Sequence, residues 1–247
     1  MNKVAKVTLI FWIMKICATT LGETGGDMFS MTFNIGYQKS SLIFITLFLI
    51  VMTVQVLAKK FNPFLFWTVI LLTSTAGTNI SDFMDRTLHL GYARGSLILV
   101  AGLITVLTAW FLCEKSLSVS NIHTHKAELF YWFAILFSNT LGTAFGDFLS
   151  DNLNLGFAGG AILISSLIFL TILAWKFTKI SPVLLFWIAF VLTRPFGATF
   201  GDFMTKPVAK GGLNFGTIGS SSVLIVILIG LTFYTYFKEK HISNSNV

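Results

Sequence analysis

Eight long apolar segments occupy most of this 247-residue sequence. They cover approximately residues 7–33, 40–58, 64–84, 96–112, 129–149, 159–175, 183–203 and 217–237. A bilayer core of about 30 Å needs roughly 20 apolar residues per helix, so each segment is suited to one membrane-spanning helix. Because 55% of the residues are hydrophobic and only 11% are charged, little chain is left for a soluble domain. We therefore expect one all-α transmembrane domain over residues 1–247.

An internal repeat is visible in four aromatic pairs, which open the odd-numbered segments. The pairs are Phe11-Trp12, Phe66-Trp67, Tyr131-Trp132 and Phe186-Trp187, and their tryptophans are separated by 55, 65 and 55 residues. Counted from each tryptophan, position +10 is always glycine and position +15 is always aspartate. An Asn-x-Gly or His-x-Gly turn follows each aspartate, and the fourth unit reaches it after five extra residues.

The repeat defines four units, at approximately residues 7–58, 64–112, 129–175 and 183–237, and the longest loop is 113–128. The pattern of each unit predicts a helical hairpin, in which an acidic first helix is followed by a short turn and an almost purely apolar second helix. Two crossings return the chain to its starting side, so eight transmembrane helices form four tandem hairpins in one orientation. Such parallel repeats are related by an axis along the membrane normal. The arrangement is expected to be pseudo-fourfold or two-plus-two.

The distribution of basic residues predicts the orientation in the membrane. Ten lysines flank the segments on the N-terminal side, against five lysines and arginines on the opposite side. The positive-inside rule then places both termini in the cytoplasm and the chain in the cell inner membrane. The net charge of +7 is spread out, and without a run of five or six adjacent basic residues we expect no nucleic-acid partner. The lipid bilayer is the expected partner, and a homo-oligomer remains a hypothesis.

A polar stripe runs along the first helix of every unit. Positions +7, +8, +11, +15 and +18 fall within an arc of about 100° on a helix of 100° per residue. An ionisable group at the bilayer centre costs at least ~2.5 to 3.5 kcal/mol, so the stripe should face other helices or water. Its candidate ion-binding residues are Asp27, Asp82, Asp147 and Asp202, with Glu23, Thr78, Asn139, Thr143 and Arg194. Carboxylates that converge at low dielectric need protons, cations or basic side chains as compensation.

Small residues at positions +10 and +14 lie beside the stripe and predict close helix packing, with a hinge as the alternative. They are Gly22, Gly26, Gly77, Ser81, Gly142, Gly146, Gly197 and Gly201. Two basic residues depart from the repeat. Arg194 is expected to pair with Asp202 or a neighbouring carboxylate, with contact to an anionic substrate as the alternative. Lys15 is expected to snorkel toward the interface, and the tryptophans are candidates for an interfacial belt.

The aromatic pair, the glycine, the Gly-Asp and the Asn-x-Gly turn together resemble the DUF347 repeat family of bacterial and archaeal membrane proteins. The resemblance covers approximately residues 7–237. It implies the fourfold repeat architecture and brings no settled activity, so function has to be inferred from the residues.

The stripe favours a transporter or channel for a small cation, either a divalent metal or proton-coupled. Carboxylate, hydroxyl and amide oxygens suit hard divalent ions, and Asp27, Asp82, Asp147 and Asp202 are the candidate metal ligands. A bound divalent cation is the one cofactor considered. The alternative is a non-transporting scaffold protein with structural aspartates. A remote alternative is an intramembrane aspartyl protease that uses Asp147 and Asp202; otherwise we expect no enzyme.

Overall fold

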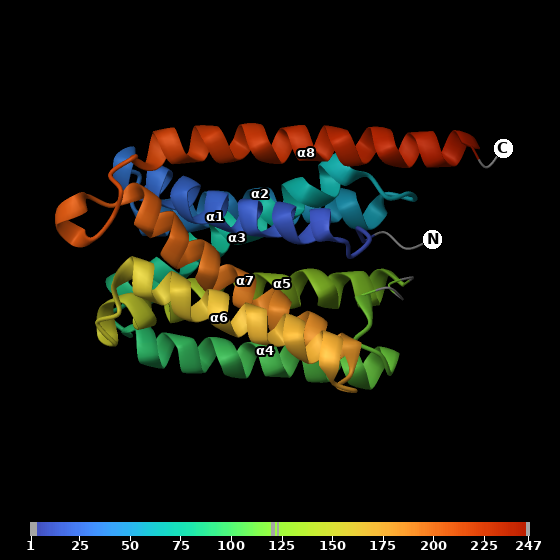
Figure 1. Cartoon of the computed structure of the whole chain (residues 1–247), viewed down its shortest axis with the longest axis horizontal. Coiled ribbons are helices and arrows are strands. Elements are labelled where there is room, and N and C mark those ends of the chain that lie inside the picture. The colour runs from blue at the N-terminus through green and yellow to red at the C-terminus, as the bar shows by residue number, and fades with distance from the viewer. Residues whose placement is uncertain (1–3, 120–121, 123, 246–247) are drawn as a thin grey trace.

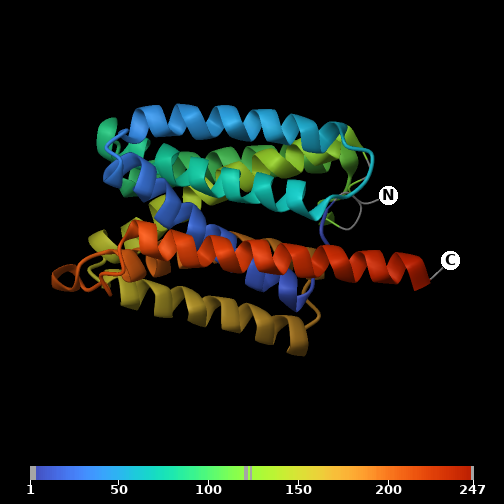
Figure 2. The ribbon, with the colours of Figure 1, turned by 90° about the horizontal axis from the view of Figure 1, so that it is seen from above.

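The computed structural model of this chain describes residues 4–119, 122 and 124–245, and this part of the chain is all-helical (Figure 1). Its eight α-helices are α1 (Leu9–Asp27), α2 (Tyr37–Leu57), α3 (Pro63–Asp82), α4 (Tyr92–Glu114), α5 (His125–Asp147), α6 (Gly156–Phe177), α7 (Pro182–Thr205) and α8 (Thr217–Ser245). They run roughly along the long axis of the bundle in both views (Figures 1 and 2). We call the end where odd-numbered helices lead into even-numbered ones the turn end, and the opposite end the tryptophan end.

Local sequence explains where α1, α3 and α5 begin. The Thr8 hydroxyl accepts a hydrogen bond from the Phe11 amide at 3.3 Å, and the Thr124 hydroxyl accepts one from the Ala127 amide at 3.0 Å. Asn62 caps α3 in the same way, with Pro63 as its first residue. These side chains satisfy amides that have no partner within the helix, and proline at the first position lacks such an amide.

The repeated turns share one backbone conformation. Helices α1, α3 and α5 continue into five-residue π-helices, which are η1 (Met28–Thr32), η2 (Phe83–Thr87) and η4 (Phe148–Asn152). The turn itself has positive φ at Asn34, His89, Asn154 and Asn214, and again at Gly36, Gly91, Gly156 and Gly216. Asparagine and glycine tolerate this left-handed region best, which explains their spacing in the sequence.

The fourth unit reaches the same turn by a different route. Helix α7 ends at Thr205 without a π-helix, and a short 3-10 helix, η5 (Val208–Lys210), follows. The Phe215 amide still donates to the Met204 carbonyl at 2.9 Å, as the Ile35 amide donates to the Phe29 carbonyl at 3.3 Å. The extra residues therefore form a loop that projects from the turn end (Figure 1).

The first helices of the four units form a closed inner ring. Helix α1 packs against α3, α3 against α5, α5 against α7, and α7 against α1. The second helices lie outside this ring, and each packs mainly against the first helix of the next unit: α2 against α3, α4 against α5, α6 against α7, and α8 against α1. The two helices of one unit are therefore not each other's main partners, and the units interlock around the ring.

Glycines at position +10 allow the inner helices to approach closely. An added Cβ atom on Gly77 would lie 2.9 Å from the Thr140 amide nitrogen and 3.0 Å from the Asn139 carbonyl carbon. Gly22 lies in the same way against Ser74, Gly142 against Arg194 and Pro195, and Gly197 against Thr19. At position +14, Gly26, Gly146 and Gly201 also face the next inner helix, while Ser81 is buried. Small residues thus occupy all four contacts of the ring, as close helix packing requires.

Aromatic side chains join the same helices at the tryptophan end. The aromatic residue before each tryptophan contacts the tryptophan of a neighbouring unit: Phe11–Trp67 at 5.7 Å, Phe66–Trp132 at 5.5 Å, Tyr131–Trp187 at 6.5 Å and Phe186–Trp12 at 5.7 Å between ring centroids. Trp67, Trp132 and Trp187 are buried. The expectation of an interfacial tryptophan belt is wrong for these three, because they pack against aromatic neighbours inside the bundle.

The outside of the bundle is apolar. Leu42, Leu97, Ile162 and Val226, on the four outer helices, are among the most exposed large hydrophobic residues. Within the described residues, seven helical segments are long and apolar enough to cross a membrane, and α1 is the α-helix outside this set. Exposed apolar faces of this extent are typical of a multi-pass membrane protein.

Candidate functional site

The four repeated aspartates converge inside the ring near the turn end. Asp27, Asp82, Asp147 and Asp202 are only 2–5% exposed, as the inward-facing stripe predicts. They form two pairs, each bridged by one basic side chain. Arg86 lies 2.8 Å from Asp82 through Nε and 3.2 Å from Asp147 through a terminal nitrogen. Lys206 Nζ lies 2.5 Å from Asp27 Oδ2 and 3.1 Å from Asp202 Oδ1.

The bridging residues give the site a two-plus-two pattern. Arg86 and Lys206 both follow the aspartate of their own unit by four residues, at position +19, and both reach the aspartate of an adjacent unit. The other two units have Met31 and Asp151 at this position. Sequence reasoning missed both bridges because it counted Arg86 and Lys206 as loop charges. The Asp-to-base spacing of four residues, which places both side chains on one helical face, was the available signal.

Lys206 follows the last residue of α7, at the turn end of the site. Its side chain is 19% exposed, whereas the side chains alone of Asp27 and Asp202 are 4% and 7% exposed. Burial opposes the charge of Lys206, but the attraction of Asp202 and Asp27 is stronger, so its pKa lies above the usual value. The charged form of the ammonium group is therefore favoured, and it lies between two carboxylates, partly open to solvent.

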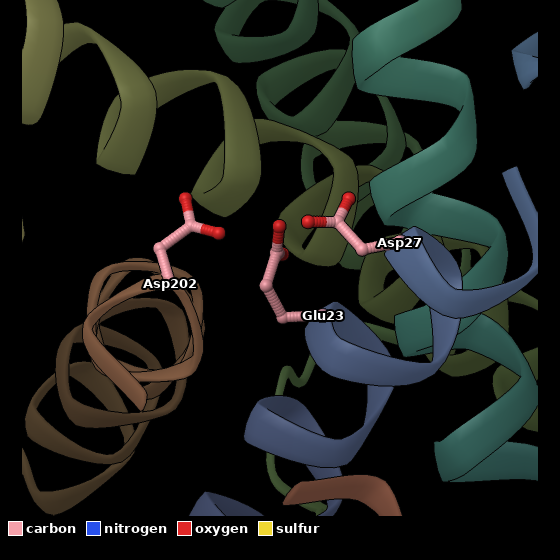
Figure 3. Close-up of side chains that lie close together, drawn as sticks. All are labelled: Glu23, Asp27 and Asp202. Atoms are coloured by element: carbon pink, nitrogen blue, oxygen red, sulfur yellow. The ribbon is translucent and has the colours of Figure 1, made fainter. Parts of the chain in front are cut away.

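A third carboxylate joins the pair at Lys206. Glu23, Asp27 and Asp202 each place one oxygen within 4.8 Å of the others, and all three residues are buried. Glu23 and Asp27 are one turn apart on α1, and Asp202 faces them from α7 (Figure 3). We call these residues the acidic triad. Their spacing is compatible with a single cation shared by three carboxylates.

Arg194 occupies the centre of the ring beneath the triad and is fully buried. One terminal nitrogen lies 3.0 Å from Glu23 Oε2 and also donates to the Thr78 hydroxyl. The other terminal nitrogen donates to the Thr19 carbonyl at 3.3 Å. The prediction that Arg194 pairs with a carboxylate agrees with this geometry, and the partner is Glu23 rather than Asp202.

Lys15 and Asn139 extend the polar network toward the tryptophan end. Lys15 is fully buried, and its ammonium group donates to Asn139 Oδ1 at 3.3 Å and lies 4.0 Å from the centroid of Phe190. The expected snorkelling of Lys15 is wrong, because its side chain finds an amide oxygen and an aromatic face inside the ring. Asn139 in turn donates to the Thr73 hydroxyl at 2.9 Å and to the Ser74 hydroxyl at 3.3 Å.

Two threonines occupy the same repeat position as Glu23. The Thr78 hydroxyl lies 3.2 Å from Glu23 Oε2. Thr143 is fully buried, and its hydroxyl has no hydrogen-bond partner within the described residues. An unsatisfied hydroxyl at this depth is costly, so a ligand or water that bonded to it would be favoured.

The polar network ends at apolar residues. Position +3 holds Lys15, Ile70, Ile135 and Phe190, which are all fully buried. The aromatic contacts at the tryptophan end follow. Polar and charged groups therefore extend from the partly exposed Lys206 into the ring as far as Lys15, and apolar side chains close the opposite end.

The fold and the site together define a multi-pass helical membrane protein, built from an internal repeat around a buried cluster of paired charges. The sequence matches the Repeat of Unknown Function (DUF347) at four places, residues 10–61, 65–116, 130–181 and 185–241. The chain therefore belongs to the DUF347 repeat family, which confirms the resemblance and the internal repeat. Comparisons with curated proteins and with solved structures gave no match.

Proposed function

We propose that this protein is a membrane transporter for a small divalent cation, with the acidic triad as its binding site. The observation that carries the proposal is the position of Lys206, whose ammonium group already lies between Asp27 and Asp202 with Glu23 nearby. The same carboxylates that stabilise the Lys206 ammonium group would also stabilise a free cation at this position.

Charge balance favours a divalent ion. With all its carboxylates ionised, the triad carries three negative charges, and its two basic partners, Lys206 and Arg194, carry two positive charges. A divalent cation that replaced both basic groups would leave the local charge unchanged. Carboxylate oxygens are preferred ligands of hard divalent ions, and the hydroxyls of Thr78 and Thr143 are candidate additional ligands. Lys206 can withdraw toward solvent because it follows the end of α7.

The proposal includes eight membrane spans, in four units of one orientation. Helix α1 has 19 residues and is about 28 Å long at 1.5 Å per residue, close to the thickness of a bilayer core. It is less apolar than the other helices because it carries Lys15, Glu23 and Asp27, all buried. Its neighbours α3, α7 and α8 keep these groups away from lipid. The excess of lysines at the tryptophan end favours a cytoplasmic location for that end and for both termini.

The structure supports an aspartyl protease less well than a transporter. Asp147 and Asp202 belong to different ion pairs, each with a basic side chain. An aspartyl protease instead needs two carboxylates that share one proton. The scaffold alternative is favoured by one observation, since Arg86 joins Asp82 to Asp147 across two units. We assign a structural role to Asp82 and Asp147, which Arg86 bridges, and assign ion binding to the triad.

Replacing Asp202 by asparagine tests the proposal. The side chain keeps its shape and loses its charge, so uptake of Mn²⁺ into proteoliposomes should fall at least about tenfold, the lower range for disturbing a metal site. Asp151→Asn is the matched control, because Asp151 is exposed, and it should transport like the wild type. Equal Mn²⁺ uptake by the wild type, Asp27→Asn and Asp202→Asn, all verified as folded, would contradict the proposal in favour of the scaffold.

Replacing Lys206 by glutamine gives a second, opposite prediction. Removal of the tethered cation relieves the competition for Asp27 and Asp202, so Mn²⁺ should bind the purified protein more tightly, by about five- to tenfold. The exposed Lys39, also at the turn end, provides the control Lys39→Gln, for which affinity should stay within twofold. The free Mn²⁺ signal in electron paramagnetic resonance measures both. Weaker binding in Lys206→Gln would show that the ammonium group is not a competitor.

A further inference from the structure

We infer that Arg194 is the gate of the ring, and that a cation opens this gate by taking Glu23 away from it. The inference rests on the proposed function, because it assigns a mechanical consequence to binding at the acidic triad. Arg194 itself needs no contact with the cation, because it acts through Glu23.

The reach of Arg194 carries the first step. The side chain starts on α7 and bonds to Thr19 and Glu23 of α1 and to Ser74 and Thr78 of α3. Its stem lies against Gly142 of α5, where an added Cβ atom would collide with Arg194 Cβ and Cγ. One side chain thus touches all four inner helices, and with Arg194 in this position the centre of the ring is filled.

Glu23 carries the second step, because it belongs to both the gate and the triad. It is the carboxylate partner of Arg194, at 3.0 Å, and one of its oxygens lies within 4.8 Å of carboxylate oxygens of Asp27 and Asp202. A cation at the triad attracts the charge that now holds Arg194. A buried arginine that loses its carboxylate is strongly destabilised in place. Occupancy of the triad therefore loosens the gate.

The surrounding charges set the direction in which Arg194 moves. Lys15 lies fully buried on the tryptophan side of Arg194 and repels it. Asp82 lies one helical turn beyond Thr78 on α3, toward the turn end. The present partner of Asp82 is Arg86, whose side chain is 37% exposed and also lies 3.2 Å from Asp147, so Arg86 keeps a carboxylate when Asp82 pairs with Arg194. Asp82 is thus the next carboxylate along α3 beyond Thr78, which Arg194 already contacts, and Arg194 exchanges Glu23 for Asp82 when the triad is occupied.

The present position of Arg194 is incompletely satisfied, which favours such an exchange. Its Nε atom is buried and has no hydrogen-bond partner within the described residues. Arginine has five N–H donors in a planar fork and tolerates poorly the loss of a partner for any of them. With one N–H donor unused, the bonded position of Arg194 is less stable than a fully bonded one. A competing carboxylate can therefore replace Glu23 as its partner.

The experiment measures Mn²⁺ binding to the purified full chain in lipid nanodiscs. Arg194→Gln removes the competitor for Glu23, so the dissociation constant for Mn²⁺ should fall at least about tenfold. Arg94→Gln is the matched control, since Arg94 is an exposed arginine of α4, and its dissociation constant should stay within twofold of the wild type. Binding by Arg194→Gln that equals or is weaker than wild-type binding would overturn the inference.

A measurement on the wild type covers the case in which Arg194→Gln does not fold. Hydrogen exchange is followed with and without Mn²⁺ for peptides from α7, with α4 as the internal reference. Release of Arg194 should accelerate exchange around residues 191–199 by severalfold on Mn²⁺ addition, and unchanged or slower exchange there would overturn the inference. If Asp27→Asn abolishes Mn²⁺ binding but hydrogen exchange in α7 of the wild type does not change on Mn²⁺ addition, only the gating role of Arg194 is refuted. Absence of Mn²⁺ binding to the wild type refutes the proposed function itself.

Discussion

Glu23→Ala is expected to lower the free energy of unfolding by about 3–5 kcal/mol, the usual cost of removing one partner from a buried ion pair. Arg194 would keep its charge in the centre of the ring, with its carboxylate partner gone and carbonyl and hydroxyl groups as its remaining contacts. The effect is large because Arg194 is fully buried and Glu23 is 3% exposed. Thermal and denaturant unfolding of the purified protein in detergent measure it.

A double substitution separates the pair from its surroundings. Glu23→Gln combined with Arg194→Met removes both charges, so most of the stability lost in Glu23→Ala should return. Asp151→Ala, at an exposed position, should change the free energy of unfolding by less than about 1 kcal/mol. If Glu23→Ala were as stable as Asp151→Ala, the ion pair with Arg194 would not hold the ring together.

Local periodicity predicted much of the inner ring correctly. Glycine at +10 and aspartate at +15 recur in every unit, and their angular separation on a helix places one at the packing seam and the other on the inward face. The structure has Gly77 against α5 and Asp82 buried beside it. These features depend on residues of a single helix, so a sequence without any three-dimensional information contains them.

The periodicity of single helices could not predict the contacts between units. Arg86 is 61 residues from Asp147, and Lys206 is 179 residues from Asp27. Which aspartate each base bridges depends on the order in which the four inner helices close the ring. The outer helices raise the same difficulty, because α2 is almost uniformly apolar and its composition does not distinguish packing on α1 from packing on α3.

Buried basic residues were misplaced for a related reason. Snorkelling is the normal expectation for a lysine near the end of a membrane helix, and Lys15 departs from it because Asn139 and Phe190 receive its ammonium group. Those residues lie on α5 and α7 and become neighbours of Lys15 only in the closed ring. The departures of Lys15 and Arg194 from the repeat, visible in the sequence, were the signal that this centre is asymmetric.

Gly77→Ala is expected to destabilise the protein by about 1–3 kcal/mol, the usual cost of overpacking. The added Cβ atom would lie 2.9 Å from the Thr140 amide nitrogen and 3.0 Å from the Asn139 carbonyl carbon. Both are backbone atoms, which cannot rotate away as a side chain does, so α3 and α5 would have to separate. Their separation would also disturb Asn139, the partner of Lys15.

Gly230→Ala is the matched control, because Gly230 lies in α8 with open space around its Cα atom. Alanine is favoured over glycine within a helix by about 1 kcal/mol, so Gly230→Ala should raise the midpoint of thermal unfolding. The same chemical change is thus expected to have opposite signs at the two positions, as intrinsic helix propensity alone would not predict. If both variants were stabilised, α3 and α5 would not be in backbone contact, and the closed ring that brings the four aspartates together would be wrong.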